Sequence, residues 1–242
     1  HDLIYTTSGR RYWANDGGVY RNDAGQMSWI KCKNLPLTQF YHTDFNLHEP
    51  NNYWGGAQDN GIQKGHGGAD INNWTSVAPA DGFNCAFHPT DPQTFWVEIQ
   101  NGAINRTFDG GNSWQQGNTC LGTTDRCNWD TPFFISRHSP YTLYAATYRA
   151  YSSSDGTGWG VASGDLTDGI VFESRFHTIS TFAESPLQTG KLVAGTSDGN
   201  VWWRTPAGAW TNVTLGLPNR YVTSVQASPS SATRLFTTHS GV

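Results

Sequence analysis

Short runs of alternating apolar and polar residues fill the chain, and clusters of turn residues separate them. KLVAGTS around Val193 and RLFTTHS around Phe236 are examples. Alternation over about four to eight residues, bounded by Gly, Pro, Asn, Asp or Ser, is typical of half-buried β-strands. The chain has a single Met and few Lys, Leu and Glu residues, which are the residues that helices favour. The pattern therefore predicts an all-β protein.

The strand pattern recurs with a constant period. One marker is a tryptophan that follows a turn, and its intervals are 45, 40, 45 and 51 residues, as differences between the positions Trp29, Trp74, Trp114, Trp159 and Trp210. A second marker lies in the middle of each unit, with intervals of 41, 42, 48, 49 and 43 between Trp13, Trp54, Trp96, Tyr144, Val193 and Phe236. Two markers with one period indicate a protein built from internal repeats.

Each unit holds two recurring turns. The first strand ends at a proline-containing turn such as FHPTDP or ESPLQT, and the second ends at an Asn/Asp-Gly turn such as QDNG or SDGN. Four short antiparallel strands per unit of about 45 residues are typical of a β-propeller blade. We expect one propeller domain, or a fragment of one, over 1–242, with blades at 2–35, 38–79, 81–118, 130–166 and 177–217 and a partial blade at 221–242.

The sixth unit contains only two strands, so about five and a half blades are visible. A blade that stops after two strands leaves open strand edges, which folded proteins avoid. We therefore expect the chain to be part of a larger propeller, with more blade sequence before or after it. The alternatives are closure by unrecognised strands or by a partner chain.

Composition limits the partners and the compartment. The formal net charge is −4 and only 14% of residues are charged, which excludes the basic face that nucleic-acid binding needs. No apolar run approaches the ~20 residues of a membrane span. No signal peptide is recognisable, as in a mature secreted protein or an excised fragment. We expect no cofactor. Asp- and Asn-rich turns could hold structural calcium, although no loop has the ligand spacing of a known calcium motif.

Four cysteines fit an oxidising compartment. Cys120 and Cys127 flank the polar loop LGTTDR, and we favour a disulfide between them. The pairing of Cys32 and Cys85 stays open. The spacings give no metal site, because the chain lacks a C-x-x-C motif and a paired His-x-x-x-His.

One turn carries a known motif. Residues 107–114 read TFDGGNSW, which resembles the Asp-box, or BNR repeat, S/T-x-D-x-G-x-T/S-W. Residues 22–29 look like the same box with one extra residue, and residues 153–159 look like a shortened one. The box residues are Asp23, Gly25, Trp29, Asp109, Gly111, Trp114, Asp155 and Trp159. The Asp accepts backbone N–H groups across the hairpin, the Gly supplies a positive φ and the Trp packs beneath the turn.

The whole chain is similar to secreted bacterial Asp-box propeller proteins, whose units read like GGVYRNDAG and YWGGAQDNGIQ. The same box occurs in sialidases, xyloglucanase-type glycoside hydrolases and sortilin-type receptors. The resemblance implies a propeller and a secreted or cell-surface location. It implies no single activity, because one fold serves many functions. We interpret the box residues as structural.

Propeller ligands usually lie at the mouth of the channel, where the connection from one blade enters the first strand of the next. The repeat places aromatic and hydrogen-bonding residues there, which are Gln39, Tyr41, His42, Trp129, His177 and Arg220. Aromatic faces stack on sugar rings, and Asn, Gln and Arg meet hydroxyl groups. We interpret these residues as a ligand-binding set; the alternative is that they cap strands around a water-filled channel.

Catalysis is the main alternative to binding. Glycoside hydrolysis usually needs two carboxylates, and Asp81 and Asp130 begin the first strands of adjacent units. A sialidase would need three clustered arginines; Arg126, Arg175 and Arg220 lie near the blade connections, but the Arg-Ile-Pro type motif is absent.

We therefore expect a secreted or cell-surface binding or scaffold module whose ligand is a glycan or an extracellular protein. The alternatives are a xyloglucanase-like glycoside hydrolase and a structural subunit of a larger extracellular assembly.

Overall fold

A computed structural model describes residues 2–15, 17–33, 38–68, 73–117, 119–122, 124–170 and 177–241. The chain separates into two compact units, His1–Phe83 and Asn84–Val242, and each unit is considered by itself. The described residues contain strands and one 3-10 segment, η1 (Thr119–Gly122). None of their helices is long and apolar enough to cross a membrane.

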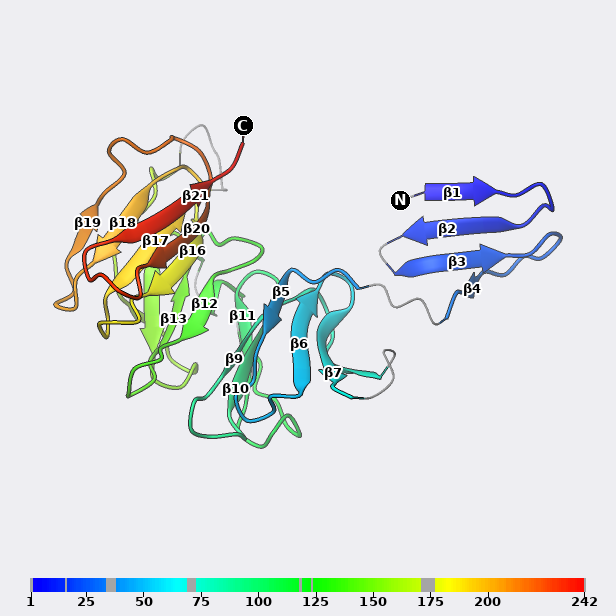
Figure 1. Cartoon of the computed structure of the whole chain (residues 1–242), viewed down its shortest axis with the longest axis horizontal. Helices are drawn as coiled ribbons and strands as arrows, with labels where there is room; N and C mark the ends of the chain where they lie inside the picture. Colours follow the sequence, from blue (N-terminus) through cyan, green and yellow to red (C-terminus); the bar gives the residue numbers. More distant parts are fainter. Residues whose placement is uncertain are drawn as a thin grey trace. The chain divides into compact units, whose positions relative to one another are not determined.

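The first unit contains two four-stranded sheets, in each of which strands that follow one another in sequence are antiparallel neighbours (Figure 1). The strands of blade 1 are β1 (Asp2–Tyr5), β2 (Arg11–Asn15), β3 (Gly18–Asn22) and β4 (Ile30–Lys31). The strands of blade 2 are β5 (His42–Asp44), β6 (Asn52–Ala57), β7 (Gly61–His66) and β8 (Trp74–Ala78).

The second unit continues the same meander. Blade 3 has β9 (Gly82–Phe87), which starts at the end of the first unit, β10 (Phe95–Ile99) and β11 (Ala103–Thr107). Blade 4 has β12 (Phe133–Ile135), β13 (Leu143–Ala146), β14 (Ala150–Ser153) and β15 (Gly160–Val161). Blade 5 has β16 (Ile179–Glu184), β17 (Leu192–Thr196), β18 (Val201–Arg204) and β19 (Trp210–Asn212), and blade 6 has β20 (Val222–Ala227) and β21 (Leu235–His239).

These sheets confirm the predicted all-β fold with antiparallel, four-stranded blades. Blades 1, 2, 4 and 5 have four strands, and blade 6 has two. Blade 3 differs, because its fourth strand is reduced to one bridge between Arg106 and Gln115. After that bridge the chain leaves the sheet and forms η1.

The hydrophobic core of the second unit lies between neighbouring sheets. One cluster joins blades 3 and 4 through Trp96, Ile104, Phe133, Leu143 and Tyr151, among others. A second joins blades 4 and 5, and a third joins blades 5 and 6 around Val193, Val222 and Val225. Complete burial of one such side chain contributes about 1.5–3 kcal/mol, so the seams between blades stabilise the unit.

One repeat position controls how closely two blades approach. It is the fourth residue of β10, β13 and β17, and Gly56 has the matching place in β6. A Cβ on Gly195 would lie 2.5 Å from the side chain of Val222, and one on Gly56 would overlap the backbone of Phe83. Ala146 is the small residue of blade 4. In blade 3 the position holds Glu98, which is therefore an exception to the repeat.

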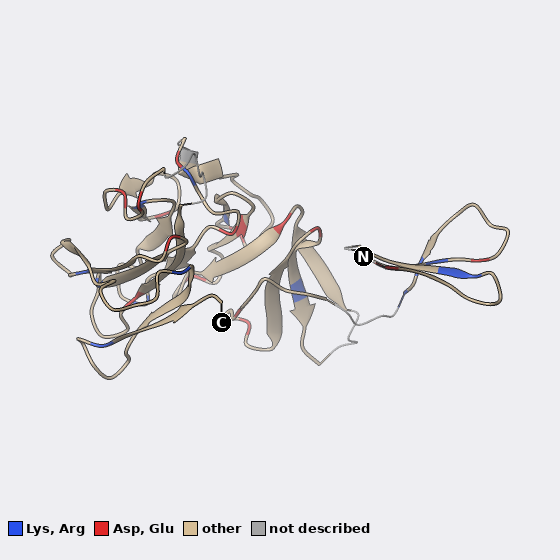
Figure 2. Cartoon of the chain, turned by 90° about the horizontal axis from the view of Figure 1, so that it is seen from above, with Lys and Arg blue, Asp and Glu red and all other residues tan. Residues whose placement is uncertain are grey.

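Most of the strand length carries no charged residue, and Lys, Arg, Asp and Glu are scattered along the described chain (Figure 2). The box turns join the third strand of a blade to its fourth. This arrangement leaves the opposite turn, between the second and third strands, beside the start of the next blade, where the candidate site lies.

Candidate ligand-binding site at the mouth of the second unit

In the second unit, the starts of blades 4, 5 and 6 and the turns between second and third strands form one face, which we call the mouth. The Asn101 N–H donates to the Trp129 carbonyl at 2.9 Å, and the Ile179 N–H donates to the Thr147 carbonyl at 2.7 Å. The Asn128 amide donates to the Tyr221 hydroxyl at 3.2 Å, which links the starts of blades 4 and 6. Connections far apart in sequence thus meet at the mouth.

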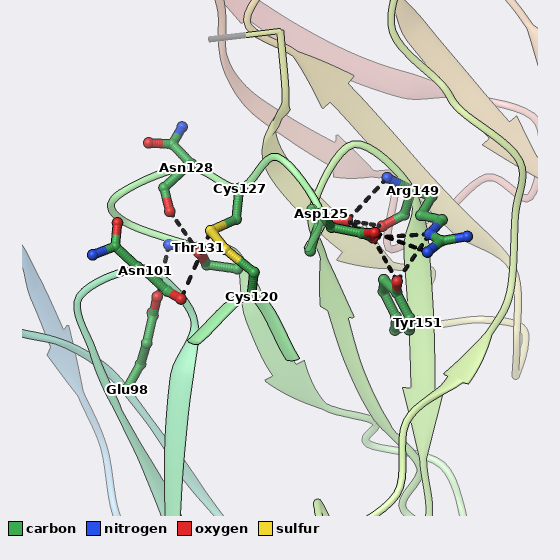
Figure 3. Close-up of a disulfide and its surroundings, with 10 residues drawn as sticks. Glu98, Asn101, Cys120, Asp125, Cys127, Asn128, Thr131, Arg149 and Tyr151 are labelled. Carbon is green, nitrogen blue, oxygen red and sulfur yellow. Dashed lines mark hydrogen bonds and ion pairs between the residues drawn. A yellow bond between two sulfur atoms is a disulfide. The ribbon is translucent and has the colours of Figure 1, made fainter. Parts of the chain in front are cut away.

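A disulfide closes the loop at the start of blade 4. Cys120 and Cys127 are joined, which is the pairing that the sequence favours, and the Cys120 N–H donates to the Asn101 carbonyl at 2.7 Å. The Thr131 hydroxyl donates to the Asn128 carbonyl at 2.7 Å. In Figure 3 the disulfide lies between a buried carboxyl group, Glu98, and a network around Asp125.

The network around Asp125 is a charged, hydrogen-bonded anchor. The Arg149 guanidinium donates to both carboxylate oxygens at 2.8 Å, Thr147 donates at 2.9 Å, and the Tyr151 hydroxyl also donates (Figure 3). Burial raises the pKa of Asp125, but hydrogen bonds from Arg149, Tyr151 and Thr147 outweigh it and lower the pKa below 3.8. The pKa of Arg149 is raised, chiefly by its hydrogen bonds to Asp125. Both groups are therefore ionised at neutral pH.

Arg126 connects the disulfide loop to blade 5. Its guanidinium carbon lies 4.3 Å from the centre of the Tyr148 ring, and Arg149 lies 5.2 Å from the same ring. Its Nη2 donates to Asp165 at 2.9 Å and to the Thr167 hydroxyl at 3.2 Å. These contacts fix a planar cation and an aromatic ring in one stack at the mouth.

His177, at the start of blade 5, belongs to the same face. Its carbonyl accepts the Arg126 Nε–H at 3.3 Å, its Nδ1 lies 2.9 Å from the Gly169 carbonyl, and the same nitrogen lies 3.4 Å from the Asp198 carboxylate. The ring is thus oriented by partners from blade 5 and from the connection before it. These contacts account for the position of the His177 ring and do not indicate a catalytic role.

Glu98 is buried beneath the disulfide loop with 0% of its surface exposed. Its carboxylate accepts the Thr131 N–H at 2.7 Å and the Asn84 amide at 3.4 Å. Burial, followed by the charge of Asp130, raises its pKa well above 4.5. Glu98 therefore favours the protonated form, in a position where other repeats have Gly or Ala.

The predicted ligand-binding residues divide between the two units. Trp129 and His177 belong to the second, at the mouth contacts described above, and so does Arg220, whose carbonyl oxygen lies 3.4 Å from Nδ1 of His239. The other three belong to the first unit, where Gln39 is exposed, His42 begins β5 and the Tyr41 hydroxyl donates to Gln58 at 3.2 Å. Their role in binding stays a prediction.

The proposed catalytic pair is also divided. The Asp81 carboxylate accepts the Asp59 N–H at 2.8 Å and so braces a hairpin turn in the first unit. Asp130 lies in the second unit, where its charge acts on Glu98. A catalytic pairing of Asp81 with Asp130 therefore stays a prediction. Arg175 lies outside the described residues.

The turn of residues 107–114 is held together by its own aspartate. Asp109 accepts the Ser113 hydroxyl at 2.5 Å and the Ser113 N–H at 2.9 Å, and the Thr107 hydroxyl donates to it at 2.8 Å. Hydrogen bonds from Ser113 and Thr107 lower the pKa of Asp109 to about 2. Gly111 has a φ of +93°, and the Trp114 ring packs 5.4 Å from Phe95.

The aspartates of the other two box-like turns, Asp155 and Asp23, make different contacts. Asp155 accepts the Thr157 N–H at 2.8 Å within its own turn and also contacts Arg106 at 3.5 Å. Asp23 instead forms ion pairs with Arg10 at 2.7 Å and with Arg21 at 3.3 Å. Gly25 has a φ of +79°, and Trp29 packs 5.8 Å from Trp13. All of these contacts stabilise turns or the sheet beside them.

Sequence reasoning missed Glu98, Asp125, Tyr148 and Arg149. One signal was available: Tyr148 and Arg149 occupy the turn that is Asn/Asp-Gly in other repeats, so this turn departs from the chemistry of the rest. The described residues contain no group of three or more His, Cys, Asp or Glu side chains that could hold a metal ion.

Comparisons with known proteins agree with this architecture. No protein-family model matches the chain, and no curated protein matches its sequence. The GH74 enzyme of Niastella koreensis is similar in structure, with 19% identity, a TM-score of 0.61 and coverage of 97% of this chain and 40% of that one. The GH74 xyloglucanase of Xanthomonas campestris has 10% identity, a TM-score of 0.61 and coverage of 95% and 42%.

A third similar structure is YCF48 bound to D1 peptide, with 17% identity, a TM-score of 0.56 and coverage of 84% of this chain and 61% of that one. The chain has a β-propeller fold. It spans about two fifths of the length of the two GH74 enzymes. At these identities the likeness concerns the fold and carries no residue roles to this chain.

Proposed function

We propose that this chain is the ligand-binding part of a secreted or cell-surface propeller protein of the Asp-box type, and that its mouth in the second unit binds a glycan. The observation that carries the proposal is the Arg126–Tyr148 stack, fixed at 4.3 Å where three blade connections meet. A fixed planar face loses little conformational entropy when it binds a ring.

The surrounding groups suit hydroxyl recognition. Asn128, Tyr221 and His177 supply amide, hydroxyl and imidazole groups from the starts of three different blades. Each can donate or accept a hydrogen bond, and Tyr221 is 39% exposed. Because Arg126 and Arg149 both lie beside aspartates, the site favours a neutral sugar over a polyanion.

The disulfide supports the proposed location. A bridge between Cys120 and Cys127 persists in oxidising compartments, and secreted proteins commonly carry such bridges. The likeness to GH74 enzymes, which include a xyloglucanase, also favours a glycan as the ligand class.

A glycan array followed by calorimetry tests the proposal. We expect Tyr148→Ala to weaken binding by about tenfold, because it removes the ring on which Arg126 is stacked. Tyr53→Ala is the matched control, since Tyr53 is 63% exposed on β6 in the first unit. No binding to any neutral glycan, or equal affinity in Tyr148→Ala and the original chain, would contradict the proposal.

A protein ligand is the second candidate, and the structure of YCF48 with a bound peptide is the observation that favours it. The same two variants separate the candidates when extracellular proteins replace glycans as probes. Tyr148-dependent binding of a protein, without glycan binding, would replace the first proposal by the second.

Hydrolysis is the remaining alternative. We expect the chain to bind xyloglucan or another β-glucan without cleaving it. Release of reducing sugar that disappears in both Asp81→Asn and Asp130→Asn would establish a glycoside hydrolase instead and overturn the binding-only proposal.

A further inference from the structure

A pocket of about 150 Å³ lies in the seam between blades 3 and 4, and neither Arg126 nor Tyr148 of the mouth lines it. Its side-chain lining comes from the end of blade 3 and from the box turn of blade 4. The main contributors are Arg106, Gln115, Gln116, Leu121, Thr157 and Trp159.

The reduced fourth strand of blade 3 creates this pocket. In blades 4 and 5 the strands β15 and β19 occupy the outer edge of the sheet. In blade 3 only Arg106 and Gln115 are bridged, and η1, which contacts β11, follows in sequence. The chain touches β11 once more at Gly117, where a Cβ would overlap the Ile104 carbonyl. The space beside this contact is left unfilled.

The next seam shows what the pocket lacks. Trp210 of blade 5 donates its indole N–H to the Ala162 carbonyl at 3.0 Å, next to β15 of blade 4. Trp159 is the corresponding tryptophan of blade 4, and its N–H has no hydrogen-bond acceptor among the described residues. The Gln116 amide likewise makes no hydrogen bond within that part of the chain. Two polar side chains of the lining are thus available to a ligand.

The remaining polar groups of the lining are held in place by the protein. The Arg106 Nε–H donates to the side-chain amide oxygen of Gln115 at 2.8 Å, and the guanidinium pairs with Asp155 at 3.5 Å. The Thr157 hydroxyl donates to Asp155 at 2.6 Å. The charge of Arg106 is therefore balanced by Asp155, which favours a neutral ligand over an anion.

We propose that this pocket binds one neutral pyranose ring, such as the terminal sugar of a glycan. A cavity of about 150 Å³ holds roughly six heavy atoms, so one edge of a pyranose enters it and the rest of the sugar stays outside. The Trp159 ring offers an aromatic face, and its N–H together with the Gln116 amide offers hydrogen bonds to hydroxyl groups. The pocket borders the mouth at Gly102 and Leu121, but Arg126 and Tyr148 do not line it, so the proposal does not depend on ligand binding at their stack.

Saturation-transfer NMR with the full chain and a panel of free neutral hexoses and pentoses tests the pocket. We expect at least one sugar to bind, and Gln116→Ala to weaken it by about fivefold, as loss of one hydrogen bond implies. Trp159→Phe keeps a ring and removes the N–H, so we expect a similar loss. Gln226→Ala, an exposed glutamine on β20, is the matched control.

Three results would contradict the proposal that this pocket binds a sugar. They are that no sugar of the panel binds, that affinity is unchanged in Gln116→Ala, or that Tyr148→Ala abolishes binding, which would place the sugar at the mouth. Gln116 is exposed, so we expect Gln116→Ala to fold. This variant therefore tests the pocket even if Trp159→Phe does not fold. A mouth that binds nothing while the pocket binds a sugar would remove only the function proposed for the mouth.

Discussion

At the scale of single residues, two acids of the second unit have opposite environments. Asp109 lies in an exposed turn and is surrounded by hydrogen-bond donors, so its carboxylate is stabilised. Glu98 is removed from water and lies near a second carboxylate, so its neutral form is stabilised. The sequence revealed the first, because a turn motif surrounds Asp109. It did not reveal the second, because the partners of Glu98, Thr131 and Asn84, come from neighbouring strands.

Glu98→Gln should change the pH dependence of stability. An acid whose pKa is higher in the folded than in the unfolded chain retains its proton on folding, so the free energy of unfolding falls as pH rises between the two values. The groups facing Glu98 are Asp130, Asn84 and the Thr131 N–H. We expect this fall above pH 4.5 in the original chain and its loss in Glu98→Gln, measured by denaturant unfolding at a series of pH values.

The control is Glu49→Gln, because Glu49 is a half-buried partner of Lys64 in the first unit. Its profile above pH 4.5 should match that of the original chain. Parallel profiles for Glu98→Gln and the original chain would show that Glu98 is ionised in the folded state.

At the scale of strands and turns, the repeat was readable because each blade repeats the same turn chemistry. The tryptophan markers and the Asn/Asp-Gly turns locate the four-stranded sheets of blades 1, 2, 4 and 5. Trp114 suggested an equal fourth strand in blade 3, but there the chain forms only one bridge. The disulfide loop and η1 follow directly, and their contacts with Asn101 are tertiary, so local sequence could not indicate the shortened strand.

The mouth was predictable only in outline. The repeat indicates where each blade begins. It therefore predicted which connections, those with Trp129 and His177, lie at the mouth. The Asp125–Arg149 pair joins a loop to a hairpin 24 positions away in sequence, and no local pattern encodes such a pairing.

Arg149→Lys should destabilise the second unit. A lysine cannot donate two parallel hydrogen bonds to Asp125. The Asp125 side chain is 5% exposed, so the cost of burying its charge would be less well offset. We expect a loss of about 1–3 kcal/mol in the free energy of unfolding. Denaturant unfolding measures this loss. Arg137→Lys is the control, because Arg137 is an exposed arginine after β12. Equal losses in the two variants would mean that the bidentate pair contributes nothing specific.

At the scale of the whole molecule, the apolar core lies in the seams between blades. Among the described residues, the three clusters named above each draw side chains from two neighbouring blades. The unit is therefore stabilised by successive pairwise interfaces, as in other repeat proteins. The small residues at the fourth position of the second strand determine how closely those interfaces close.

Gly195→Ala tests the importance of close approach. Its added methyl group would meet the side chains of Val222 and Thr181, both within 2.8 Å of the new atom. We expect a loss of about 1–3 kcal/mol, which is typical of overpacking. Gly164→Ala is the control, because no atom lies within 4 Å of a Cβ there. A thermal midpoint unchanged by Gly195→Ala would mean that the seam can relax.

The exception at Glu98 also affects how the blades could be rearranged. A blade that carries glycine at this position fits against a neighbour whose first strand presses on it, as Val222 does on Gly195. The blade that carries Glu98 needs a neighbour that offers a backbone N–H, as Thr131 does. Each of these two seams thus requires a particular residue at the start of the next blade. Blades cut from this chain and shuffled in a designed array would not be interchangeable, although their sequences repeat.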